Sequence, residues 1–162
     1  MQLARTPRIG PVTFFQLLTK FGSAKAALNA LPSFAKGRQP VRPPSRDSIK
    51  RELDEALAFD GRILCAADPD YPPLLKQLAP PPPVLSIKGR VDLFQGRSVA
   101  IVGARQASAA GRKLARDISA DLSKAGFNIV SGLARGIDGE ARAASLDGGA
   151  VAVLAGGLNR VY

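Results

Sequence analysis

Hydrophobic residues change their spacing along the chain, and the change divides the sequence into two parts. In the first part they gather in short groups, as at residues 13–18 and 24–28, which predicts small helices. Gly22 breaks the first group, and Ser23 is placed to cap the second helix. Two short helices joined by a glycine turn resemble SAM-like or helix-hairpin-helix modules.

A third helix is predicted after Ser45, where Ile49, Leu53 and Leu57 recur at every fourth position and form one apolar face. The stretch before it, residues 34–44, is rich in proline, glycine and arginine and is typical of a linker. We therefore expect a helical module with a basic linker over residues 1–60.

Short apolar runs next predict two strands, at residues 62–66 and 84–87, with a short helix at 71–75 between them. The four prolines at 80–83 must be extended. Such a run can be a ligand for SH3 domains, but apolar sequence follows at once, which favours a rigid crossing between two domains.

From Arg97 onward, strands and helices alternate. The pattern predicts a helix over residues 109–124 with Leu114, Ile118 and Leu122 on its inner face, ended by Gly126. The other predicted elements are strands at 98–102, 127–130 and 150–154 and a helix at 137–146.

Two consecutive β-α-β units predict a parallel, doubly wound α/β sheet, here an incomplete Rossmann-like domain over residues 61–162. The chain ends at Tyr162 after three strands, whereas such sheets usually have five or six. We therefore expect further strands beyond this sequence.

Ligands of open α/β sheets bind at the carboxyl ends of the strands, where three loops fall. These are residues 103–108, 131–138 and 155–158; all contain small residues, and the first two lead into helices. The first two also contain arginines, Arg105 and Arg135, whose side chains can grip phosphate oxygens and are expected to point into one pocket.

A dinucleotide is not the expected ligand. Arg105 replaces the second glycine of G-x-G-x-x-G, and the second strand ends in Ser131-Gly132 without the acid that would hold a ribose. The P-loop pattern of ATP-binding proteins is also missing, so NAD and ATP are both disfavoured. Asp138 remains as a candidate catalytic carboxylate, but capping its helix or holding an arginine explains it better.

Composition supports an anionic partner. The formal net charge is +10, which fits either nucleic acid or a basic solubilising surface. Histidine is absent and Cys65 is the one cysteine, so neither a metal cluster nor an internal disulfide is predicted. We see no signal peptide and no membrane-spanning stretch, and we expect a cytoplasmic protein without a cofactor.

Three segments resemble the DNA-processing protein A (DprA, or Smf) family: VAIVGARQASAAG, IVSGLARGIDGEARAASL and AVAVLAGGLNRVY, beginning at Val99, Ile129 and Ala150. The segment that leads up to the predicted sheet, DPDYPPLLKQLAPPPPVLSIKG, is also similar to that family, and so are the N-terminal helices.

The resemblance implies a protein that binds single-stranded DNA and delivers the recombinase RecA during natural transformation, and that is not an enzyme. By motif position, Arg105 contacts the DNA backbone, and the remaining implied DNA-binding residues are Gly103, Ser108, Gly111, Ser131, Gly132, Arg135, Gly136 and Asp138. Surfaces for homodimer formation and for RecA are expected beyond Tyr162. Arg142 stands where the family usually has histidine, which argues against acid–base chemistry there.

Two alternatives remain open. One is a nucleotide-processing enzyme of the phosphoribohydrolase type, although its P-G-G-x-G-T-x-x-E motif is absent from these residues. The other is that the N-terminal helices act as a protein-docking module.

Overall fold

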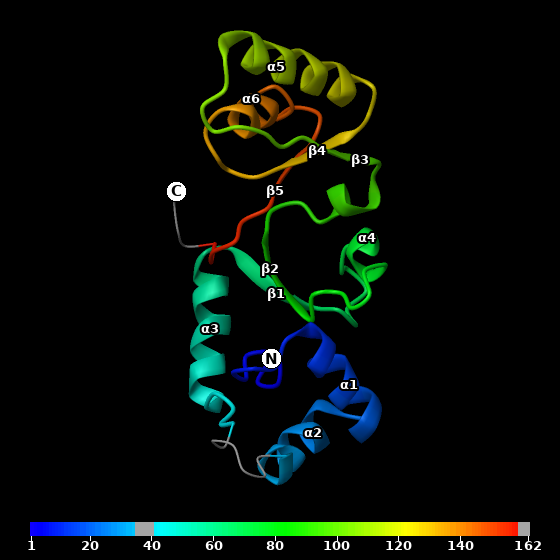
Figure 1. Cartoon of the computed structure of the whole chain (residues 1–162), viewed down its shortest axis with the longest axis vertical. Helices are drawn as coiled ribbons and strands as arrows, with labels where there is room; N and C mark the ends of the chain where they lie inside the picture. Colours follow the sequence, from blue (N-terminus) through cyan, green and yellow to red (C-terminus); the bar gives the residue numbers. More distant parts are fainter. Residues whose placement is uncertain (35–40, 159–162) are drawn as a thin grey trace. The chain divides into compact units, whose positions relative to one another are not determined.

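The computed structural model describes residues 1–34 and 41–158. The chain forms two compact units, Met1–Gly89 and Arg90–Tyr162, each with its own packing. Figure 1 shows the order of their elements along the chain. Most of the predicted linker at 34–44 falls on residues 35–40, which lie outside the described part.

The first unit opens with the two predicted helices, α1 (Pro11–Phe21) and α2 (Ala24–Ala30), followed by the 3-10 turn η1 (Leu31–Phe34). Ser23 caps α2, since its Oγ accepts a hydrogen bond of 3.1 Å from the N–H of Ala26. Gly22, with φ +74°, lets the chain turn between the helices. The buried residues of this small core are Leu3, Leu17, Ala27 and Leu31.

Helix α3 (Arg46–Ala58) confirms the third predicted helix, and the Ser45 Oγ caps it by accepting from the N–H of Ser48 at 3.0 Å. Its predicted apolar face is only partly used. Ile49 is buried, whereas Leu53 and Leu57 are exposed.

Strands β1 (Gly61–Cys65) and β2 (Val84–Lys88) pair antiparallel, with α4 (Pro73–Lys76) between them. Tyr71 is buried beneath the proline run and donates its hydroxyl to the Pro82 carbonyl at 2.7 Å. Burial raises the pKa of this hydroxyl, which keeps it protonated as a donor. Because α3 packs on β1, the strand pair belongs to the first compact unit, and the boundary predicted at residue 60 stays a prediction.

The second unit holds the predicted parallel sheet. After the 3-10 turn η2 (Asp92–Gln95) the elements are β3 (Ser98–Ala100), α5 (Ala109–Lys124), β4 (Asn128–Ser131), α6 (Ile137–Ala143) and β5 (Ala150–Ala152). The strand order is β3-β4-β5 and both pairings are parallel. The predicted fold class, a helical N-terminal module followed by a Rossmann-like parallel sheet, is confirmed.

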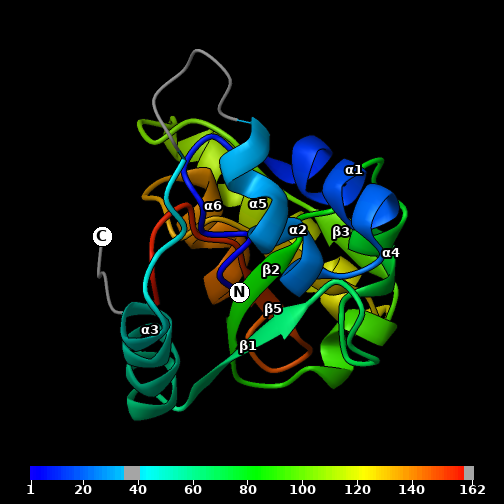
Figure 2. The same cartoon turned by 90° about the horizontal axis from the view of Figure 1, so that it is seen from below.

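Helices α5 and α6 lie on the same face of this sheet. They pack against each other, and both contact β4 (Figure 1, Figure 2). A doubly wound sheet needs helices on both faces, which these two do not supply. The register places Ala100, Val130 and Val151 side by side on the face opposite the buried Ile129.

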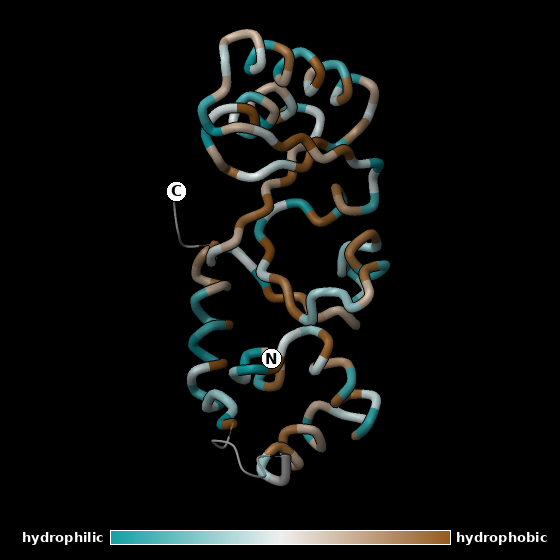
Figure 3. Tube along the Cα trace, in the orientation of Figure 1, coloured by the Kyte–Doolittle hydropathy of each residue, from teal (hydrophilic) through white to brown (hydrophobic). Residues whose placement is uncertain are grey.

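The predicted inner face of α5 is wrong, although the helix spans the predicted residues. Leu114 and Ile118 are 60% and 44% exposed, whereas Ala115 and Ser119 are buried. Hydrophobic and hydrophilic positions alternate along this helix in Figure 3. Small residues turn inward because α5 packs directly against α6, where Ala141 is fully buried.

Among the described residues, no helix has the length and apolar character needed to pass through a lipid bilayer.

The core of the first unit makes a stability prediction. Leu3→Ala should lower the free energy of unfolding by about 2–4 kcal/mol, because it empties a buried site. Leu57→Ala removes the same atoms from a side chain that is 65% exposed and should cost about 0.5 kcal/mol or less. Urea denaturation of both variants measures the difference, and equal losses would contradict this assignment of the core.

Candidate nucleic-acid interface

Two of the loops predicted to bind an anion meet at one edge of the three-stranded sheet. Because β3 and β4 run parallel, their carboxyl ends lie side by side, and residues 103–108 and 131–136 follow directly. The first loop leads into α5 and the second into α6.

Gly136 joins the two loops by close backbone approach. It has φ +82°, and a Cβ at this position would lie 2.6 Å from the Arg105 carbonyl oxygen, with the Ala104 carbonyl also in contact. The next residue, Ile137, donates its backbone N–H to the Ala104 carbonyl at 3.2 Å. Only glycine fits both the left-handed conformation and the space, so the loops lock together here.

A second connection runs through Asp138, which is buried. Its Oδ1 accepts a hydrogen bond of 3.1 Å from the backbone N–H of Gly103. The expected roles of this residue were capping α6 or holding an arginine; the structure shows neither, since the N-cap of α6 is Gly136 and has no side-chain bond. The N–H of Gly103 is consequently used inside the protein rather than left for an anion.

The remaining small residues of the predicted site also build the loops. A Cβ on Gly103 would lie 2.7 Å from the Ile137 side chain, and one on Gly132 would lie 2.7 Å from Asp138 Oδ2. Ser131 is buried and donates its hydroxyl to the Ile101 carbonyl at 2.7 Å, which ties β4 to the end of β3.

Helix α5 starts at a side-chain cap. The Ser108 Oγ accepts from the N–H of Gly111 at 3.1 Å. Gly111 needs to be small, since a Cβ there would lie 3.3 Å from that same Oγ. The cap fixes where the first loop ends and the helix begins.

The arginines differ from every other member of the predicted set. Arg105 and Arg135 are exposed, and in residues 1–34 and 41–158 neither has a hydrogen-bond or ion-pair partner. Arg135 directly precedes Gly136, which touches the Arg105 carbonyl, so the two backbones are neighbours. Two neighbouring cations that form no ion pair within the described residues favour an anionic ligand. Their sharing one pocket stays a prediction.

Sequence reasoning missed two residues of this site. Ile137 fills the space beside Gly103 and holds the loops together; a large apolar residue directly after the S-G-L-A-R-G run was the available signal. Arg112 lies in the first turn of α5, is exposed, and is without an ion-pair partner in the described part of the chain. Because a helix N-terminus disfavours positive charge, this arginine is a further candidate phosphate contact.

The described residues contain no group of three or more cysteine, aspartate or glutamate side chains arranged to hold a metal ion.

Comparison with known families decides which family the chain belongs to. Residues 62–162 match the family model for DNA recombination-mediator protein A, and residues 1–55 match the model for the DprA-like N-terminal HHH domain. The chain belongs to the DNA recombination-mediator protein A family.

Relatives in this family cover most of the chain. DNA processing protein DprA of Bacillus subtilis is 41% identical in an alignment 129 residues long that covers 71% of this chain and 43% of the relative. The X-ray structure of DprA from Streptococcus pneumoniae matches 95% of this chain and 60% of its own, with a TM-score of 0.60 and 26% identity.

A solved structure of DNA processing protein A from Helicobacter pylori describes the single-stranded DNA binding mode of that protein. It matches 57% of this chain and 42% of the Helicobacter pylori chain. Its TM-score is 0.51 and its identity 28%. The chain thus spans less than half of the Bacillus and Helicobacter relatives.

The contact between the two loops predicts that alanine substitutions at Gly136 and Gly139 have very different effects on stability. Gly136→Ala should lower the free energy of unfolding by about 2–4 kcal/mol, because the new Cβ clashes with two carbonyl oxygens and the backbone is left-handed. Gly139→Ala lies inside α6 with only an ordinary contact, and should be neutral or about 0.5–1 kcal/mol more stable. Thermal or urea unfolding measures the stability of both variants. If Gly136→Ala left the free energy of unfolding unchanged, the close contact between the two loops would be contradicted.

Proposed function

We propose that this chain binds single-stranded DNA without strong sequence preference, with Arg105 and Arg135 gripping the phosphate backbone. The observation that carries the proposal is that these two exposed arginines, unpartnered in the described residues, stand on loops locked to each other. The single-stranded DNA binding of the Helicobacter pylori relative supports the choice of ligand.

Charge supports a backbone ligand. A guanidinium group offers parallel N–H donors that match two oxygens of one phosphate. The formal net charge of +10 adds a long-range attraction for any polyanion. Backbone contacts carry no sequence information, so all sequences should bind alike.

The other predicted residues take a structural role in this proposal. Gly103, Ser108 and Gly111 shape the first loop, and the second wall is formed by Ser131, Gly132, Gly136 and Asp138. We propose binding without catalysis, because Asp138, the one acidic residue in the two loop sequences, holds the Gly103 N–H.

Membership of the family extends the proposal. We propose that the protein also delivers RecA onto the bound strand during natural transformation, in the cytoplasm and as a homodimer; membership of a recombination-mediator family supports the part in recombination. A reconstitution with RecA and coated single-stranded DNA tests this step, and no acceleration of RecA loading would contradict it.

Removal of one arginine should weaken DNA binding uniformly. Arg105→Ala should raise the Kd for oligonucleotides of any sequence by about fivefold to thirtyfold, as expected for the loss of one charge-assisted phosphate contact. Fluorescence anisotropy with labelled single strands at fixed salt measures this change.

The matched control is Lys124→Ala, which removes one exposed charge at the opposite end of α5. Its Kd should stay within about twofold of the unaltered chain, since a distant exposed charge is screened at physiological salt. Equal effects of the two substitutions would mean that binding follows net charge rather than the loops.

A further inference from the structure

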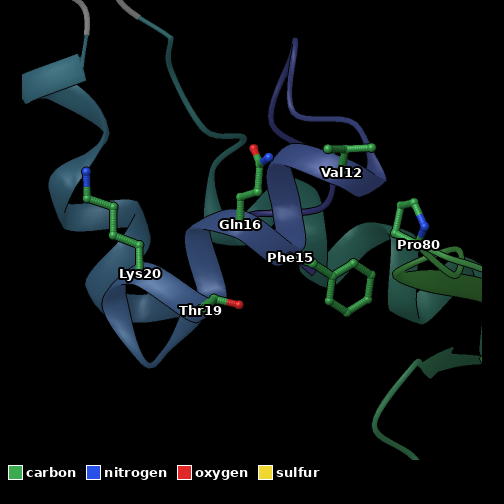
Figure 4. A pocket seen from close by; sticks show the side chains of 6 residues that line it. All are labelled: Val12, Phe15, Gln16, Thr19, Lys20 and Pro80. Atoms are coloured by element: carbon green, nitrogen blue, oxygen red, sulfur yellow. The ribbon is translucent and has the colours of Figure 1, made fainter.

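The helical unit contains a pocket that the proposed DNA site does not use. It is a shallow, largely open hollow on one face of α1, bordered by Pro80, with a volume of about 410 Å³ (Figure 4). Its lining residues are Val12, Phe15, Gln16, Thr19, Lys20 and Pro80.

The floor of the pocket is apolar and includes an oriented aromatic ring. Phe15 packs edge-to-face with Phe14, with ring centroids 5.1 Å apart and an interplanar angle of 83°. Val12 is 54% exposed, so an apolar surface faces solvent beside that ring. Figure 4 shows Val12 and the Phe15 ring on the part of α1 nearer Pro80, and Lys20 farther along the helix. A flat ring beside a proline suits a planar ligand.

The rim is polar and can pair with the edge of such a ligand. The Gln16 amide supplies both a donor and an acceptor, and the Thr19 hydroxyl does the same. Neither side chain has a hydrogen-bond partner within the described ranges. Lys20 adds a positive charge at the same rim.

Charge around the pocket favours a polyanion over a peptide or a lipid. Lys20 on α1 lines the hollow and Lys25 lies on α2, and neither helix contains an acidic residue. A neutral apolar partner gains nothing from this bias, but a nucleotide strand does.

We propose that this pocket holds one unpaired base of single-stranded DNA, stacked on Phe15 beside Pro80, with the neighbouring phosphate near Lys20. The inference rests on the proposed function, because it gives the same strand a second contact. It assigns the helical unit a direct part in DNA binding: the loops hold backbone phosphates, and the pocket takes a base.

Oligonucleotides with and without bases test the stacking. Phe15→Leu keeps an apolar side chain but loses the aromatic face; it should raise the Kd of the full chain for oligothymidylate by roughly threefold to tenfold. Its Kd for a strand of the same length with abasic sites should not change. Phe59→Leu, an exposed phenylalanine outside the pocket, should leave both values unchanged. Circular dichroism of each variant confirms that the fold is kept.

Photocrosslinking supplies an independent readout on the unaltered chain. A strand containing 5-iododeoxyuridine should crosslink to the tryptic peptide of residues 9–20, which contains Phe15. Crosslinks confined to peptides of residues 90–158 would contradict the proposal that the pocket binds a base.

The two proposals fail in distinguishable ways. If Arg105→Ala weakens binding to both strands while Phe15→Leu changes neither, the pocket is wrong and the loop site stands. If the unaltered chain binds neither strand, the proposed function is wrong, and this base site is wrong with it.

Discussion

The close contact between Gly136 and the carbonyls of the first loop is the constraint on which the candidate site depends. It brings the ends of β3 and β4 together at backbone distance, and the Gly103–Asp138 hydrogen bond closes the same junction from the other side. Gly103, Gly132, Gly136 and Asp138 are used in this junction. The charged side chains that face solvent from these loops are Arg105 and Arg135, and the loops therefore present positive charge from a fixed backbone.

This division of roles changes how a strand-end loop recognises an anion. In a dinucleotide site, backbone N–H groups and a helix N-terminus approach the phosphate. Here the Gly103 N–H is occupied by a carboxylate, and α6 begins at a glycine pressed against a neighbouring loop. In the proposed site, arginine side chains make the contact, and they suit a repeating phosphate backbone whose exact position varies. In the further proposal, the aromatic ring of Phe15 on α1 takes one base of the same strand.

Much of this could be predicted from the sequence where a local signal was sufficient. Ser23 and Ser45 each marked a helix start, because a cap is set by residues three positions apart. The inner face of α5 could not be predicted in this way, because Leu114 and Ile118 fit the helical period but the distance to α6 selects Ala115 and Ser119. The partner of Asp138 lies 35 residues away, so no short-range pattern identifies it.

The salt dependence of single-stranded DNA affinity tests the central claim most directly. Counterion release gives a slope of log K against log salt of about 0.7 per phosphate contacted on single strands. Replacing both Arg105 and Arg135 with alanine should reduce that slope by about 1.4, whereas Lys124→Ala should leave it unchanged. An unchanged slope in the double variant would contradict the account, because the strand would then be held by charges outside the two locked loops.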